Sequence, residues 1–143
     1  MAKLVLPRVH VMVLCDQIEP SPAEGDVFDL RGVRTFIAAP AFPYTQPQLC
    51  VYLQMTGHEG TAAGRAVIVD PETDLNLEET GQDVIEFRGP LEFVHVPWKV
   101  NDCTFREPGI YYVQVFFDGK LISERPLLVQ QGEAVTGNGR AIS

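Results

Sequence analysis

The fold of this chain is decided by the stretch from Pro108 to Val129, PGIYYVQVFFDGKLISERPLLV. Apolar residues alternate in its first half, Asp118-Gly119 then interrupts the pattern, and a second apolar run follows. Alternation with period two is typical of a strand with one buried face. Asp-Gly suits a type I′ turn, because both central residues of that turn need positive φ. The stretch therefore predicts a β-hairpin that faces the core with alternate residues from Tyr111 to Phe117.

The second strand of this hairpin predicts an irregularity. Pairing outward from the turn places Val115 opposite Ile122, and two residues further along Val113 faces Glu124. A carboxylate beside a core position is costly, and proline is confined to strand edges and bulges. We therefore expect a bulge or a strand end near residues 124–126.

Similar alternation recurs along the rest of the chain. We expect strands in RVHVMVL (residues 8–14), in residues 27–37 with a bulge at Gly32, in QLCVYLQM (48–55), in RAVIVD (65–70), in VIEF (84–87) and in LEFVHVPW (91–98). The 11 prolines punctuate many short segments. Seven or eight strands predict an all-β fold, a two-sheet antiparallel β-sandwich formed by a single domain over residues 1–131. The tail, residues 132–143, lacks an apolar pattern and is predicted to be disordered.

The hairpin also favours an immunoglobulin-like version of the sandwich. Tyr111 stands where such folds place a tyrosine that ties the start of a late strand back to the backbone. The Cys…Trp…Cys pattern of antibody domains is absent, and Val113 takes the place of the usual cysteine. The term immunoglobulin-like therefore refers to architecture alone.

Several of these stretches resemble a family of small bacterial proteins of unknown function. They are RVHVMVLCD at the start of the chain, RGV with Phe36 a little later, an FP loop, and FREPGIYYVQVFFDGKLISERPLLV. The resemblance spans nearly the whole chain except the tail. It implies a bacterial origin and a β-sandwich, and it brings no activity and no catalytic residues to transfer.

The charge of the chain excludes some classes of partner. The formal net charge of −8 argues against nucleic acid, whose binding depends on lysine and arginine at phosphates. It argues equally against an anionic membrane surface. We expect an acidic protein that binds neither nucleic acid nor membranes and carries no cofactor.

The N-terminal segment and the cysteines indicate a location. Pro7 and Arg8 interrupt the first apolar run, and no small-residue cleavage site follows, so we expect no secretion signal. Cys15, Cys50 and Cys103 follow no spacing rule of a disulfide framework or metal site. We therefore expect reduced thiols in a cytoplasm.

Two candidate sites lie in the loops. The stretch from Asp70 to Glu86 holds seven carboxylates without Lys or Arg, and Asp70, Glu72 and Asp74 alternate as possible calcium ligands over the loop 70–79. Leu75 stands where the EF-hand pattern needs glycine, which favours a solvated acidic loop instead. Cys15 is a possible nucleophile of a thiol-dependent enzyme if a histidine lies close in space.

The outer face of the hairpin is the third candidate site. Residues that alternate with the core residues point outward, and a neighbouring strand from QLCVYLQM would add to them. The candidate interface comprises Tyr52, Tyr112, Phe116 and Leu121. Aromatic residues with polar surroundings are typical of interfaces, although the proline-rich loop near Phe42 could instead cover this patch. We expect a non-enzymatic module that self-associates, as a dimer, or binds a protein partner through this face.

Overall fold

The computed structural model describes residues 6–22, 25 and 27–132 of the chain. The described strands are β1 (Arg8–Cys15), β2 (Gln17–Pro20), β3 (Phe28–Arg31), β4 (Phe36–Ala39), β5 (Tyr44–Thr56), β6 (Gly60–Asp70), β7 (Leu75–Glu79), β8 (Asp83–Phe87), β9 (Val94–Phe105), β10 (Gly109–Phe117) and β11 (Lys120–Gln131). Within these residues no helix is long and apolar enough to cross a membrane. The predicted disordered tail, apart from Gly132, falls outside the described residues.

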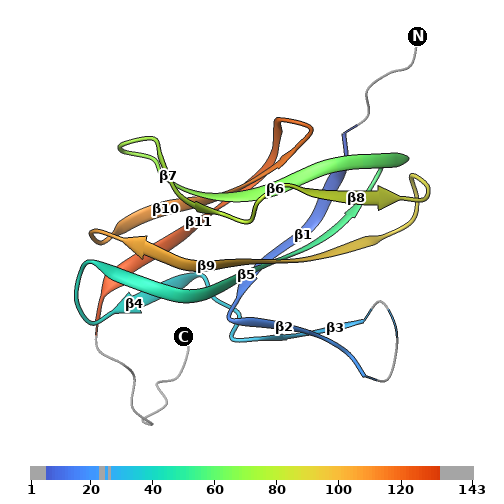
Figure 1. Ribbon diagram of the computed structural model, residues 1–143. Helices are drawn as coiled ribbons and strands as arrows, with labels where there is room; N and C mark the ends of the chain where they lie inside the picture. The colour runs from blue at the N-terminus through green and yellow to red at the C-terminus, as the bar shows by residue number, and fades with distance from the viewer. Residues whose placement is uncertain (1–5, 23–24, 26, 133–143) are drawn as a thin grey trace.

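The strands form a sandwich-like all-β fold, as the alternation predicted (Figure 1). A small sheet contains three strands in the order β1-β5-β9. A large sheet contains six, in the order β4-β11-β10-β6-β7, with β8 also paired to β6. Neighbouring strands in both sheets are antiparallel, except that β4 runs parallel to β11. The strands β2 and β3 form a separate antiparallel hairpin.

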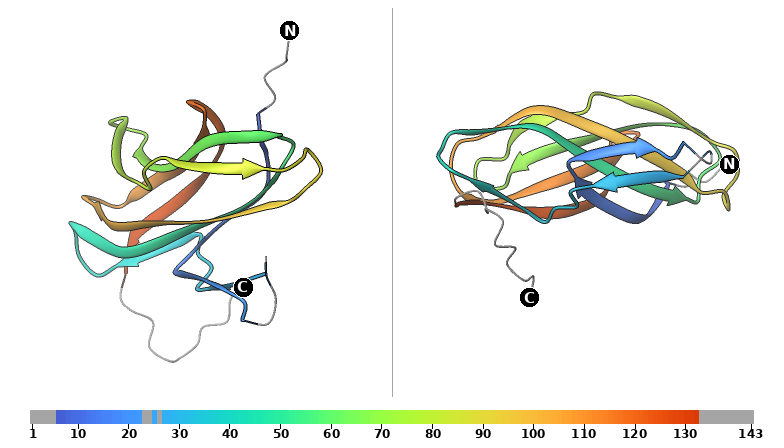
Figure 2. Two further views of the ribbon diagram at one scale, coloured as in Figure 1. Left: turned by 45° about the vertical axis from the view of Figure 1, so that its right-hand side comes forward. Right: turned by 90° about the horizontal axis from the view of Figure 1, so that it is seen from below.

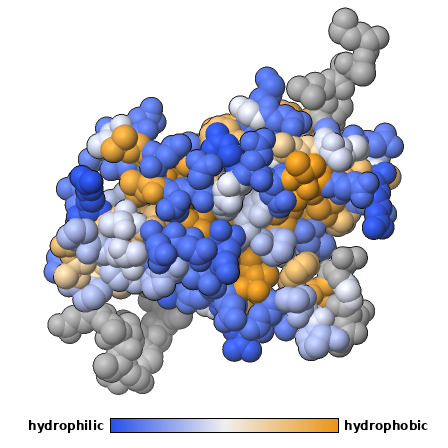
Figure 3. Space-filling model, in the orientation of Figure 1, coloured by the Kyte–Doolittle hydropathy of each residue, from blue (hydrophilic) through white to orange (hydrophobic). Residues whose placement is uncertain are grey.

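The core lies between the two sheets. Leu49, Val51, Leu53 and Met55 of β5 are fully buried in it, as the alternation of QLCVYLQM predicted. The large sheet contributes the alternate residues of β10 from Tyr111 to Phe117, which are at most 4% exposed. Seen from the side of Figure 1, the surface is mostly hydrophilic, and hydrophobic residues appear on it as separate spots (Figure 3).

The central hairpin has the predicted turn and a bulge two residues earlier than predicted. Asp118 and Gly119 both have positive φ, 49° and 80°. The register shifts at Ile122, so Val115 pairs with Ser123 and Val113 pairs with Arg125. This shift moves Glu124 to the outer face, where the amide of Gln114 donates to its carboxylate over 3.1 Å. The bulge therefore keeps the Glu124 carboxylate out of the core, which is the reason why an irregularity was predicted here.

The tyrosine expected at the start of the late strand makes its backbone contact. The Tyr111 hydroxyl donates a hydrogen bond of 2.6 Å to the carbonyl oxygen of Glu107, four residues upstream. The ring is 4% exposed and packs edge-on against Phe105, with 4.8 Å between the ring centroids. The contact fixes the corner between β9 and β10.

The sequence-based strand count is too low, because eleven strands are present in the described residues. Residues 27–37 do not form one bulged strand: Gly32, with φ of 67°, ends β3, and β4 begins four residues later. The acidic loop contains β7, which the low apolar content concealed. A register shift between Val9 and Val11 also turns Val11 and Val13 away from the core, whereas the alternation placed all three valines on one face.

Candidate functional site

The outer face of the large sheet carries exposed apolar residues on three neighbouring strands. Phe36 of β4 pairs with Leu128 of β11, and Leu128 pairs on its other side with Ile110 of β10. Their exposed fractions are 44%, 40% and 54%. Because paired residues on neighbouring strands point to the same face, these side chains adjoin one another. We call Phe36, Ile110 and Leu128 the apolar row.

Three of the four predicted interface residues lie on this same face, nearer the hairpin turn. Phe116 pairs with Leu121, which is 47% exposed, while Tyr112 is half-buried. The guanidinium of Arg65 lies 4.7 Å from the ring centroid of Phe116. A cation over an aromatic face covers apolar surface and interacts favourably with it. The turn end of the face is therefore partly shielded, and the apolar row is its more open part.

The middle of the outer face is covered by its own side chains. Val67 and Val69 of β6 point outward, since the alternating residues Ala66 and Ile68 belong to the core cluster. They are nevertheless only 1% and 7% exposed. Their neighbours on β10 and β7 are longer side chains, including Gln114. The loop around Phe42, considered as a possible cover, packs its Phe42 ring against the core cluster instead.

The fourth predicted interface residue, Tyr52, lies in the small sheet and is 6% exposed. Its hydroxyl is 2.5 Å from Nδ1 of His95, and its ring packs against Phe28 with 5.9 Å between centroids. The predicted proximity of Tyr52 and Tyr112 is wrong. The cause is that QLCVYLQM was taken as the third strand, which neighbours the hairpin in an immunoglobulin-like order, whereas β5 pairs with β1 and β9 in the small sheet.

The hairpin β2–β3, which we call the flap, lies against the outer face of the small sheet. Viewed from below, its two strands cross the near side of the molecule (Figure 2). Its base is held by Arg34, whose Nη2 donates to Oδ2 of Asp16 over 3.0 Å while Nε donates to Oδ1. The hydrogen bonding of the Arg34 guanidinium to the Asp16 carboxylate raises the pKa of Arg34 above its ordinary value. Gly32 must remain unsubstituted here, because a Cβ would lie 2.7 Å from Cγ of Asp16.

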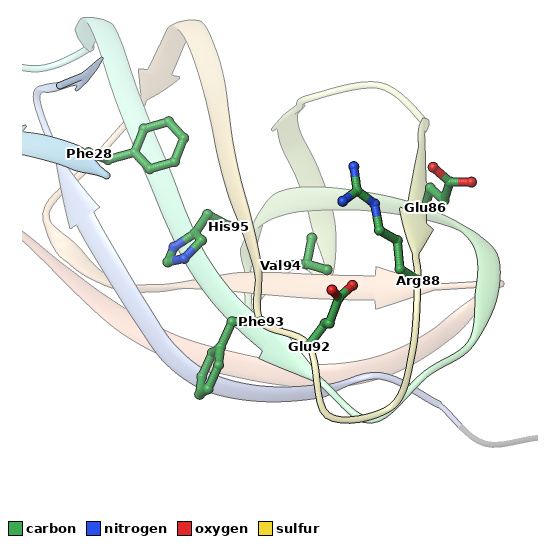
Figure 4. A pocket seen from close by; sticks show the side chains of 7 residues that line it. All are labelled: Phe28, Glu86, Arg88, Glu92, Phe93, Val94 and His95. Atoms are coloured by element: carbon green, nitrogen blue, oxygen red, sulfur yellow. The ribbon is translucent and has the colours of Figure 1, made fainter. Parts of the chain in front are cut away.

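Two hollows flank Phe28, a flap residue whose ring packs against Tyr52 and His95 of the small sheet. One, of about 430 Å³, lies between flap and sheet and is lined in part by Ile18, Cys50 and Lys99. The other, of about 320 Å³, is shown in Figure 4. There Phe28 and His95 face each other, while the oppositely charged Arg88 and Glu92 extend from the segment between β8 and β9. This second hollow thus combines aromatic surface with one positive side chain, Arg88, and two negative ones, Glu86 and Glu92.

The structure buries Cys15, the predicted nucleophile, and its surroundings raise the pKa of the thiol. The side chain is 0% exposed, and burial raises its pKa to about 11, with a further contribution from neighbouring Cys50. His10 lies 2.6 Å from the Thr56 hydroxyl, and His95 contacts Tyr52. The thiol form of Cys15 therefore dominates near neutral pH, and thiols are poor nucleophiles compared with thiolates.

The three predicted metal ligands belong to a tight turn between β6 and β7. The carboxylate of Asp70 accepts a hydrogen bond of 3.0 Å from the amide of Glu72, and its carbonyl accepts one of 2.7 Å from the amide of Asp74. Among the residues that the structure describes, no group of three or more His, Cys, Asp or Glu side chains is arranged to hold a metal ion. The oxygens of Asp70 thus organise the turn.

Sequence reasoning missed the apolar row, although part of its signal was present. Ile110 and Leu128 continue the outward alternation of Tyr112 and Pro126. What the alternation does not reveal is that Phe36 joins them, since that requires the parallel pairing of β4 with β11. Long-range parallel pairing leaves no local pattern in the chain.

One comparison with known proteins gives a match. A family model with the description "Family of unknown function (DUF6941)" matches residues 10–130, which include nearly all of both sheets and the flap. No curated protein matches the chain.

Proposed function

The chain belongs to this family of unknown function, and from the geometry of its large sheet we propose that it is a non-enzymatic module that self-associates through the apolar row. The observation that carries the proposal is the adjacency of Phe36, Leu128 and Ile110 on three paired strands. Single exposed apolar residues are normal on protein surfaces, whereas adjoining ones mark interaction sites. A second copy of the chain presents the same row, which suits a symmetric, self-complementary contact.

The chemistry around the row supports a dry contact. The outward neighbours along the three strands are Ala38, Tyr112, Pro126 and Gln130, none of which is charged. The nearest carboxylate on β11, that of Glu124, accepts a hydrogen bond from Gln114. Depletion of charge at the centre with polar residues at the rim is the usual composition of an interface. Two copies can therefore meet here without burying a carboxylate.

The net charge sets how this association responds to salt. Two chains that each carry a formal charge of −8 repel one another at long range. Salt screens this repulsion over a Debye length of roughly 10 Å at 0.1 M, while apolar contact is not weakened. The proposed association should therefore become stronger between low and physiological ionic strength.

We also propose that the sandwich is immunoglobulin-like and that the protein is cytoplasmic. The order β1-β5-β9 follows strands A-B-E of that architecture, and β6-β10-β11 follows C-F-G. The hydrogen bond from Tyr111 to Glu107 supports the same assignment. The three unpaired thiols, at Cys15, Cys50 and Cys103, fit a reducing compartment.

The test is the mass of the protein in solution over a range of concentrations, measured by sedimentation velocity. Leu128→Glu places a carboxylate in the centre of the row and should shift the wild-type assembly to monomer. Leu91→Glu is the matched control, because Leu91 is 90% exposed outside the strands and should leave the mass unchanged. Circular dichroism checks that both variants fold.

The proposal fails if wild type is a monomer at every concentration, or if Leu128→Glu and Leu91→Glu have the same mass as an associated wild type. Phe116→Glu is less diagnostic, because Arg65 lies over that ring and would pair with the new carboxylate. Ile110→Glu is the better second variant, since Ile110 is the most exposed member of the row.

A further inference from the structure

Two cysteines form a cross-strand pair on the outer face of the small sheet. Cys15 of β1 is paired directly with Cys50 of β5. Directly opposite residues of antiparallel strands point to the same face, with Cα atoms about 4.5 or about 5.5 Å apart. Both spacings fall within the range of roughly 4.4–6.8 Å that a disulfide spans. Both thiols are free in the structure.

The two sulfur atoms also lie beneath the same piece of backbone. The Cys50 thiol donates to the carbonyl oxygen of Asp16 over 3.6 Å, and the Cys15 thiol donates to that of Gln17, also over 3.6 Å. These carbonyls are consecutive: Asp16 lies between β1 and the flap, and Gln17 is the first residue of β2. Because both thiols contact this backbone, both sulfur atoms lie on the same side of the sheet. A disulfide bond between them therefore requires no change in the pairing of β1 with β5.

The two thiols differ in access and in electrostatic surroundings. Cys50 lines the hollow of about 430 Å³ between flap and sheet, whereas Cys15 does not. Lys99 of β9 pairs with Cys50 on the other side from Cys15, which gives the row Cys15–Cys50–Lys99 across the sheet. Burial raises the pKa of Cys50, and hydrogen bonds and the ammonium of Lys99 counteract that rise. The pKa of Cys50 stays above its ordinary value, so Lys99 offsets only part of the effect of burial, in the direction that favours the reactive thiolate.

From this arrangement we propose that Cys50 and Cys15 are a dithiol site that low-molecular-mass disulfides oxidise to an intramolecular disulfide, with Cys50 reacting first. A disulfide R–S–S–R enters the hollow, and the Cys50 thiolate attacks one sulfur. This forms Cys50–S–S–R and releases one R–S⁻. The released R–S⁻ accepts the proton of the Cys15 thiol, and the Cys15 sulfur then attacks the Cys50 sulfur, which forms the Cys15–Cys50 bond and releases the second R–S⁻. The protein loses two electrons and two thiol protons, and the reagent is reduced to two R–SH.

Intact-mass spectrometry of the full chain treated with glutathione disulfide tests this order. Wild type should lose the mass of two hydrogen atoms and retain no glutathione. Cys15→Ser should stop at the mixed disulfide and gain one glutathionyl group, while Cys50→Ser should gain none. Cys103→Ser is the matched control and should behave as wild type, since Cys103 pairs with Gln46 rather than with a cysteine and belongs to the core cluster.

Peptide mapping of oxidised wild type without reduction locates the bond independently of the serine variants. A linked peptide pair containing Cys15 and Cys50 supports the proposal. It is overturned if wild type stays unmodified, if it keeps the glutathionyl adduct without closing, or if the bond maps to Cys103.

Discussion

Gly64→Ala should destabilise the protein, although alanine is usually tolerated better than glycine in a strand. Gly64 lies on the inner side of β6 beneath the ring of Phe117. A Cβ at this position would lie 2.5 Å from two ring carbons of Phe117 and 2.9 Å from Cη2 of Trp98. Ordinary carbon contacts are roughly 3.5–4.0 Å, so both rings would have to move by about 1 Å.

The surroundings leave these rings little freedom to move. Phe117 is 0% exposed and stacks on Trp98, with 5.8 Å between the ring centroids, while Phe87 meets it edge-on at 6.2 Å. The indole nitrogen of Trp98 is also held by a hydrogen bond of 2.9 Å to Asp83. Overpacking of a filled core typically costs about 1–3 kcal/mol. At roughly 3 °C for each kcal/mol in a domain of this size, the melting temperature should fall by about 3–9 °C.

A double-mutant cycle in urea checks the cause. Phe117→Leu alone leaves space and should also destabilise, but the double variant should recover room for the methyl group, giving a favourable coupling of roughly 0.5–3 kcal/mol. Gly109→Ala is the control, because its Cβ would meet nothing within 4 Å, and it should be neutral or slightly stabilising. If Gly64→Ala is as stable as wild type, or if the two changes are additive, the packing argument is wrong.

Two further predictions concern the ends of strands. Tyr111→Phe should lower the free energy of unfolding by about 0.5–1.5 kcal/mol in chemical denaturation, because it removes the hydrogen bond to Glu107. Burial raises the pKa of Tyr111, so the hydroxyl contribution is present below its ordinary pKa of 10.0 and is lost as the pH rises through the folded value. Above pH 10 the free energy of unfolding should therefore fall less steeply with pH in Tyr111→Phe than in wild type. Equal pH dependence in the two proteins would contradict this. Gly32→Ala should lower the free energy of unfolding by at least about 1–2 kcal/mol because of the positive φ alone, and by more because the new Cβ would contact Asp16. Thermal melting measures the effect, and an unchanged melting temperature would show that the base of the flap is not tightly packed.

The sequence predicted local features better than long-range ones. Alternation identified the buried faces of β5 and β10 because each has one face on the core, and the Asp118-Gly119 turn followed from its need for positive φ. The bulge was expected two residues late, since the pattern shows that Glu124 must avoid the core but not which residue is displaced. Local preferences therefore constrain the existence of a feature more tightly than its position.

The candidate surfaces depended on information that a local pattern does not contain. Phe116 and Leu121 were placed on the correct face from their own hairpin, whereas Tyr52 was assigned by counting strands and fell in the other sheet. The pairing of Cys15 with Cys50 depends on the register between β1 and β5, which is set by the bulge between Val9 and Val11. A shift of one residue would turn one thiol to the opposite face.

The parallel pairing of β4 with β11 has a consequence for synthesis of the chain on the ribosome. Phe36 is synthesised well before its strand partner Leu128, which lies near the far end of the matched region. Contacts so distant in sequence form late and slowly, because closing the intervening loop must precede the gain from pairing. The large sheet cannot be completed until β11 leaves the exit tunnel. Until then β4 presents an open edge to other nascent chains, and a ribosome stalled before residue 127 should hold a product that is sensitive to protease and prone to aggregation.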